Sequence, residues 1–141
     1  MRIGNKTIGI NSKPFIIAEL SGNHKGSLKR AIKIIKQVKK AAEAKTTIVI
    51  LDSNHTHDHV LAELEAYANL ASVDSYCVVF DTVIEDLPKK MCSNRQWGPG
   101  NSPKTAVRKF LKTNNNFEVD KTIQDKLLLT VAPDGYLKRK K

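Results

Sequence analysis

Apolar residues recur through the middle of this chain in the order strand, helix, strand. Residues 46–51, TTIVIL, form a short β-branched run that is typical of a strand buried on both faces of a parallel sheet. Residues 76–80, YCVVF, form a second run of this kind. Between them, apolar side chains share one face of a predicted helix, namely Val60, Leu61, Leu64, Tyr67, Ala68 and Ala71. Two parallel strands joined by a covering helix make a right-handed crossover, so the pattern predicts an α/β fold.

An acidic residue follows each of these strands. Asp52 comes directly after the first run and Asp81 directly after the second. In parallel sheets, ligands bind beyond the carboxyl ends of the strands, so we expect Asp52 and Asp81 to converge at one edge. Carboxylates and water suit magnesium or calcium. The spacing alone is consistent with a metal site. It is equally consistent with two aspartates that only begin the loops after the strands.

The N-terminal part also has the order strand, loop, helix. A small hairpin or arm is expected within residues 1–12, and an apolar strand at residues 15–20, FIIAEL. Ser27 is expected to cap a helix that presents apolar residues on one face and lysines on the other until about residue 42.

The C-terminal part begins with a long irregular segment at residues 83–102, and loops of this length tend to be functional or mobile. A helix is predicted from Pro103, with Ser102 as its N-cap. Residues 117–119 and the apolar run KLLLTVA at 126–132 are both predicted to be strands.

Three histidines follow Asp52 in the loop SNHTHDH, which raises the possibility of a metal site. Side chains that are two residues apart share a side only in extended chain. Thr56 is a good N-cap for a helix that begins near His57, and such a helix would scatter His55, His57 and His59. We therefore expect first-turn histidines that face solvent, with a three-histidine site as the alternative.

The 141 residues are enough for one domain with a proper core, and the formal net charge is +10. Lysines spread over a predicted helix and collected at residues 138–141 account for most of this charge, and the few aromatic residues do not alternate with them. We therefore expect no nucleic-acid partner, and no membrane partner because no apolar run is long enough to span a bilayer. Cys77 and Cys92 form no CxxC pair, which favours reduced thiols in the cytoplasm.

Four segments carry a resemblance to a known family: VILDSNHTHDHVLAELEAYA, SYCVVFDTVIEDLP, WGPGNSPKTAV and KLLLTVAPDGYLKR. With these, residues 45–141 resemble the C-terminal half of the cephalosporin hydroxylase/rhamnosyl O-methyltransferase family. The resemblance implies a Rossmann-like class I methyltransferase sheet that includes an antiparallel hairpin, and S-adenosylmethionine and Mg²⁺ as cofactors. It places Asp52 and Asp81 at the metal positions and makes His55 a candidate for contacting substrate or acting as a base. Many members have two consecutive acidic residues at the second position, where this chain has Phe80 and Asp81.

Residues 8–44 are different. The segment PFIIAELSGNHKGSLKRAIKIIKQVKKA resembles the beginning of a sialic acid synthase of the N-acetylneuraminate or pseudaminate type, in which the motif AEIGxNHxG ends the first strand of a TIM barrel. Glu19, Asn23 and His24 match that motif and would be its substrate-binding residues. The resemblance implies a strand–helix unit of TIM-barrel type at residues 1–44, joined to half of a methyltransferase domain at residues 45–141.

The combination has a consequence for function. The synthase-like segment occupies the place of the glycine-rich cofactor loop of a class I methyltransferase. We expect an O-methyltransferase-like protein linked to surface-polysaccharide modification, whose small-molecule acceptor is a sugar and whose missing cofactor loop calls for a partner chain, such as a homo-oligomer. The alternatives are a catalytically dead fusion or interaction module, and a synthase-derived fragment that condenses phosphoenolpyruvate with an amino sugar. One βα unit cannot build the active site of a barrel.

Overall fold

The computed structural model describes two compact units, which belong to residues 1–45 and 46–141, and the described residues are 2–3, 6–7, 27–41 and 46–141. In the first unit, β1 (Arg2–Ile3) and β2 (Lys6–Thr7) pair antiparallel, and α1 is Leu28–Ala41. The backbone N–H of Arg30 donates to Ser27 Oγ at 3.3 Å, as expected for an N-cap at Ser27. The strand predicted at residues 15–20, and with it the proposed TIM-barrel type of unit, lies outside the described residues.

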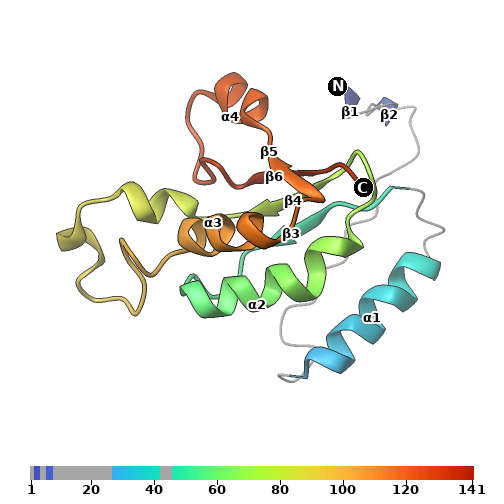
Figure 1. Ribbon diagram of the computed structural model, residues 1–141, viewed down its shortest axis with the longest axis horizontal. Coiled ribbons are helices and arrows are strands. Elements are labelled where there is room, and N and C mark those ends of the chain that lie inside the picture. Colours follow the sequence, from blue (N-terminus) through green and yellow to red (C-terminus); the bar gives the residue numbers. More distant parts are fainter. Residues whose placement is uncertain (1, 4–5, 8–26, 42–45) are drawn as a thin grey trace. The chain divides into compact units, whose positions relative to one another are not determined.

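The second unit is built on a four-stranded sheet of β3 (Val49–Leu51), β4 (Tyr76–Val79), β5 (Phe117–Val119) and β6 (Tyr136–Arg139). The strands lie in the order β3-β4-β6-β5 (Figure 1). β3 and β4 are parallel, and β6 runs antiparallel to both β4 and β5. The mixed α/β architecture is confirmed, as is an antiparallel pairing near the C-terminus, although a helix and a loop rather than a tight turn connect β5 to β6.

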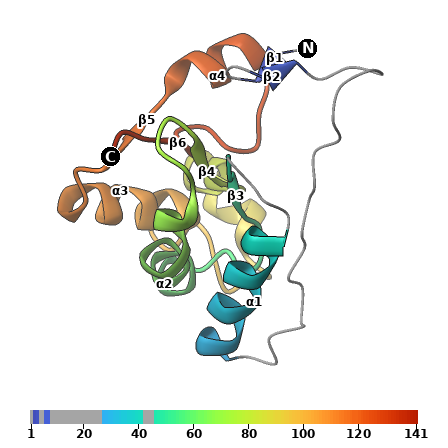
Figure 2. The same cartoon turned by 90° about the vertical axis from the view of Figure 1, so that its right-hand side faces the viewer.

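Two helices, α2 (His57–Tyr67) and α3 (Pro103–Thr113), lie side by side over one face of this sheet (Figures 1 and 2). The start of α3 follows the sequence prediction closely. Ser102 and Thr105 form a reciprocal capping box, and Pro103 occupies the first turn, where a missing N–H costs nothing. Short 3₁₀ turns at Ala68–Leu70, Thr82–Asp86 and Lys89–Cys92 complete the connections. No described helix has the length and apolarity needed to cross a lipid bilayer.

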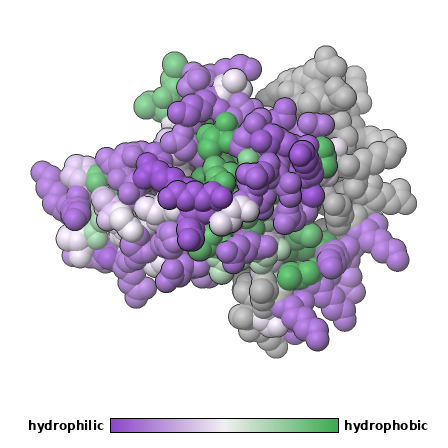
Figure 3. All heavy atoms as spheres, in the orientation of Figure 1, coloured by the Kyte–Doolittle hydropathy of each residue, from purple (hydrophilic) through white to green (hydrophobic). Residues whose placement is uncertain are grey.

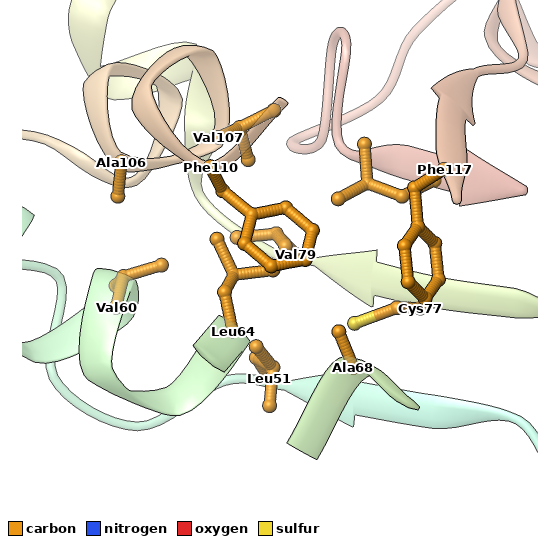
Figure 4. Packing of buried hydrophobic residues seen from close by; sticks show 11 residues of the cluster. Leu51, Val60, Leu64, Ala68, Cys77, Val79, Ala106, Val107, Phe110 and Phe117 are labelled. Atoms are coloured by element: carbon orange, nitrogen blue, oxygen red, sulfur yellow. The ribbon is translucent and has the colours of Figure 1, made fainter. Parts of the chain in front are cut away.

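The hydrophobic core lies between these two helices and the sheet. Figure 4 shows side chains from α2 and α3 pointing toward those of the strands, and Phe110 and Phe117 lie with their ring centroids 5.6 Å apart. The buried cluster is made of Leu51, Val60, Leu64, Ala68, Cys77, Val79, Ala106, Val107, Phe110, Phe117 and Leu137. The helix face predicted from Val60 to Ala71 is therefore confirmed as a core face.

Two sequence predictions about strands are wrong. The run at residues 46–51 is not buried on both faces, because β3 begins at Val49 and Ile50 is 57% exposed. The run at residues 126–132 is not a strand. Its first residues complete α4 (Lys121–Leu127), whose N-cap Asp120 accepts a hydrogen bond from the backbone N–H of Thr122.

The remaining residues of that run form a loop. Leu128 and Leu129, which follow α4, are 87% and 91% exposed. Figure 3 shows hydrophobic surface in the region of α4 among mostly hydrophilic side chains. The position between β4 and β5 that a further strand could occupy is filled by β6 instead. Strand propensity depends on such neighbours, which the apolar run itself does not specify.

Candidate metal centre

Asp52 and Asp81 meet at the edge of the sheet where β3 and β4 end. The pairing between these strands continues to their last residues, since the N–H of Phe80 donates to the carbonyl oxygen of Leu51 at 3.0 Å. The parallel register therefore brings the two following aspartates to the same edge. Ligand atoms of Asp52, His55 and Asp81 all lie within 4.8 Å of one another. The predicted convergence of the two aspartates is confirmed, and His55 joins them.

The backbone at Asp81 turns sharply to leave the strand. Its φ of 56° lies in the left-handed region, which Asp and Asn adopt more readily than most residues. In this conformation Asp81 Oδ2 lies 3.2 Å from Nε2 of His55. The His55 side chain is only 16% exposed, and that of Asp81 is 35% exposed. The pair is thus partly shielded from water.

Trp97 covers the other side of His55. Its ring lies 5.2 Å from the imidazole, measured between centroids, and the two planes meet at 75° in an edge-to-face contact. The guanidinium carbon of Arg95 lies 6.0 Å from the centroid of the same indole. Trp97 Nε1 is buried and has no hydrogen-bond partner among the residues that the structure describes. Through Trp97, the segment WGPGN thus forms one wall of the site.

The other two histidines of the loop point elsewhere, as the helix starting at His57 predicted. Nδ1 of His57 lies 2.7 Å from Thr105 Oγ1 in α3. Nε2 of His59 lies 3.0 Å from Ser53 Oγ and 3.4 Å from Glu63 Oε1. A three-histidine site is excluded by this geometry. His59 faces solvent as expected, whereas His57 does not, because it is engaged by α3.

A hydrogen-bond network holds the wall of the site and was not found from the sequence. Asn101 Oδ1 accepts from the backbone N–H of His57 at 2.8 Å, while its Nδ2 donates to the carbonyl oxygen of Gln96 at 2.8 Å. Glu85 Oε2 accepts from Ser102 Oγ at 2.6 Å and from the N–H of Gly100 at 2.9 Å. These contacts tie the loop that carries Trp97 to the first turns of α2 and α3. Except for the bond between Asn101 and Gln96, these contacts join residues that are fifteen or more positions apart, so no local pattern marks them.

Two more acidic residues near α3, Asp86 and Asp134, already have a lysine as partner. Lys104 is only 5% exposed, and its Nζ contacts Asp86 Oδ2 and lies 3.5 Å from Asp134 Oδ2. A buried lysine needs such partners, because an unpaired buried charge is costly. These carboxylates therefore serve the packing of α3, in contrast to the pair formed by Asp52 and Asp81.

The sequence of this chain matches a known protein family over most of its length. Residues 10–140 match the profile of the family described as rhamnosyl O-methyltransferase/CmcI. The chain belongs to this family. Its profile also spans residues 10–44, the segment that resembles a sialic acid synthase.

Both resemblances are also found when this chain is compared with individual proteins. Rhamnosyl O-methyltransferases of Mycobacterium tuberculosis (strain H37Rv) and Mycobacterium bovis are 35% identical over 91 residues, which cover 64% of this chain and 35% of each relative. The pseudaminic acid synthase of Campylobacter jejuni is 58% identical over 41 residues, which are 29% of this chain and 11% of the synthase. The chain thus spans about a third of the rhamnosyl O-methyltransferases that it matches. No solved structure matches it significantly.

The four-stranded sheet is consistent with a methyltransferase-like fold, and the family suggests use of S-adenosylmethionine. The residues described in this rhamnosyl O-methyltransferase/CmcI member fit one of the two expected cofactors. The carboxylates of Asp52 and Asp81, whose oxygens lie within 4.8 Å of each other, are donors that suit a hard divalent cation such as Mg²⁺, and His55 lies beside them. Among the described residues, no glycine-rich loop for S-adenosylmethionine follows a parallel strand, because the described glycines, Gly98, Gly100 and Gly135, lie elsewhere. Glu19, Asn23 and His24 lie outside the described residues.

Proposed function

We propose that this chain provides the metal-holding part of an O-methyltransferase that acts on a sugar hydroxyl. The observation that carries the proposal is the convergence of Asp52, His55 and Asp81 beyond the carboxyl ends of β3 and β4. Membership of the rhamnosyl O-methyltransferase/CmcI family supports the type of reaction, and the similarity to mycobacterial rhamnosyl O-methyltransferases supports a sugar acceptor. A role in surface-polysaccharide modification is the context that we propose for it.

In this proposal, Asp52 and Asp81 hold Mg²⁺, whose positive charge lowers the pKa of a nearby sugar hydroxyl. His55 takes the hydroxyl proton. Asp81 Oδ2, which lies 3.2 Å from Nε2 of His55, orients the imidazole. Trp97 keeps bulk water from the covered side of His55, which strengthens the interaction of that imidazole with Asp81.

We further propose that the methyl donor binds through residues other than 46–141, because a glycine-rich loop after a parallel strand is absent from that unit as the structure describes it. These residues come from the N-terminal 45 residues or from a second copy of the chain. The molar mass in solution, measured by light scattering, distinguishes the two sources. A strictly monomeric protein that binds the cofactor would exclude the second copy.

Isothermal titration with S-adenosylmethionine, with and without Mg²⁺, tests the function. We expect the wild-type protein to bind the cofactor saturably. We also expect it to bind Mg²⁺, and we expect Asp52→Asn to weaken that Mg²⁺ binding. Asp125→Asn is the matched control, because Asp125 is also exposed but lies in α4. If a protein that circular dichroism shows to be folded releases no heat with millimolar cofactor, methyl transfer by this chain alone is refuted. If Mg²⁺ also gives no heat, the metal centre is refuted as well.

A further inference from the structure

The positive charge of this protein is concentrated in one part of its sequence. Residues 1–45 contain eleven Lys and Arg but two Asp and Glu, which is a net charge of +9. Residues 46–141 contain thirteen Lys and Arg against twelve Asp and Glu, which is a net charge of +1. The unit that contains the candidate metal centre is therefore nearly neutral. A charge asymmetry of this kind indicates a polyanionic partner for the N-terminal part.

Much of this charge lies on one helix. The 14 residues of α1 include six Lys and Arg and no Asp or Glu. Four of its lysines recur at spacings of four, three and four residues, which places them in one line along the helix. This lysine stripe consists of Lys29, Lys33, Lys36 and Lys40, and all four are exposed. Away from the stripe, Ala31 is buried and Ile34 and Ile35 are half-buried, so α1 is amphipathic.

The surface along the lysine stripe is a shallow, open and basic depression. This groove is lined by the four lysines together with Ile32 and Gln37. No acidic side chain lines this groove. Lysines at these spacings repel one another and destabilise an isolated helix. An anion bound along the groove would remove that repulsion. In residues 46–141, by contrast, a buried lysine such as Lys104 is paired with a carboxylate of the protein itself.

We propose that the lysine stripe of α1 docks this protein on a bilayer surface that contains anionic lipid. This departs from the expectation of no membrane partner, which considered only segments long enough to span a bilayer. The apolar side of α1 is turned away from solvent, so the exposed lysines would bind the negatively charged headgroups by electrostatic attraction, and the lysine stems and Ile32 supply apolar surface beside the charges. A nucleic acid is the less favoured partner, because α1 contains no aromatic side chain on which a base could stack. This proposal concerns localisation, and it stands or fails separately from the methyltransferase function.

Sedimentation of the full chain with vesicles tests the proposal. Wild-type protein is expected to pellet with phosphatidylcholine vesicles that contain phosphatidylglycerol, and not with pure phosphatidylcholine vesicles, at about 0.1 M salt. Each lysine near an anionic surface strengthens binding about fivefold, so changing all four stripe lysines to glutamine should weaken binding by at least about a hundredfold. The matched control carries the same change of charge in the other unit: Lys89→Gln, Lys90→Gln, Lys109→Gln and Lys112→Gln, all at exposed positions.

The control variant should retain most of the vesicle binding. Equal losses in the two variants would show that net charge alone is responsible, and would overturn the proposal. Absence of binding to anionic vesicles by a wild-type protein that circular dichroism shows to be folded would overturn it as well. Tighter binding of a single-stranded oligonucleotide than of anionic vesicles, measured by fluorescence anisotropy, would replace the membrane with a nucleic acid.

Discussion

Asp52→Asn is expected to change the stability of this protein in opposite directions with and without a divalent cation. In the absence of metal, the carboxylates of Asp52 and Asp81 repel each other across at most 4.8 Å. Two unit charges at that separation repel by about 3.5 kcal/mol at an effective dielectric constant of about 20, and by about 0.9 kcal/mol in water. Asp52 is exposed, so the lower value applies. The substitution should therefore stabilise the metal-free protein by up to about 1 kcal/mol.

With Mg²⁺ present, the order should reverse. A cation that binds only the folded state adds about 2.7 kcal/mol at a hundredfold excess over its dissociation constant. For a chain of this size, that gain corresponds to a rise of roughly 8 °C in the melting temperature. Asp52→Asn removes one of the two charged ligands and should lose most of that rise. The melting temperature of the variant would then lie above that of the wild type in chelator and below it in Mg²⁺.

Differential scanning calorimetry in chelator and in excess Mg²⁺ or Ca²⁺ measures both effects. Asp81→Asn should behave like Asp52→Asn, because Asn also tolerates the left-handed backbone at position 81, where φ is 56°. Asp125→Asn is the control and should keep the full rise. The emission of Trp97, the only tryptophan of the chain, gives a second readout beside His55. The metal centre would be refuted if neither cation stabilised the wild-type protein. It would also be refuted if both cations stabilised the Asp52→Asn protein fully.

Three further predictions concern the neighbouring residues and the core. His55→Gln should change the emission of Trp97, because it removes the imidazole whose ring centroid lies 5.2 Å from that of the indole; an unchanged emission would contradict the contact. Burial and the hydrogen bond to Asp120 raise the pKa of Tyr76 from 10.0 to about 12, so its contribution to stability is complete below pH 10 and lost between pH 10 and 12. Urea titrations across that range should show this loss in the wild type and a smaller one in Tyr76→Phe. Leu64→Ala, at a fully buried position, should cost about 2–5 kcal/mol in urea unfolding, and a cost below about 1 kcal/mol would contradict the core packing.

The sequence was most informative where structure depends on neighbours along the chain. The helical spacing from Val60 to Ala71 correctly predicted the buried face of α2, because residues three and four apart share a side of any α-helix. Ser102 and Pro103 correctly predicted the start of α3, because their capping geometry is local. The convergence of Asp52 and Asp81 was also predictable, since a parallel crossover brings the two strand ends to one edge.

The tertiary structure decided the rest. The apolar run that continues α4 looked like a strand, yet β6 fills the place beside β4 and β5, and the exposed Leu128 and Leu129 have no sheet to join. The contact between His55 and Trp97, and the bond from His57 to Asn101, each join residues more than forty positions apart. Such pairs form only after α2 and α3 have packed on the sheet. Their geometry follows from the packing of the whole unit, so no spacing along the chain encodes it.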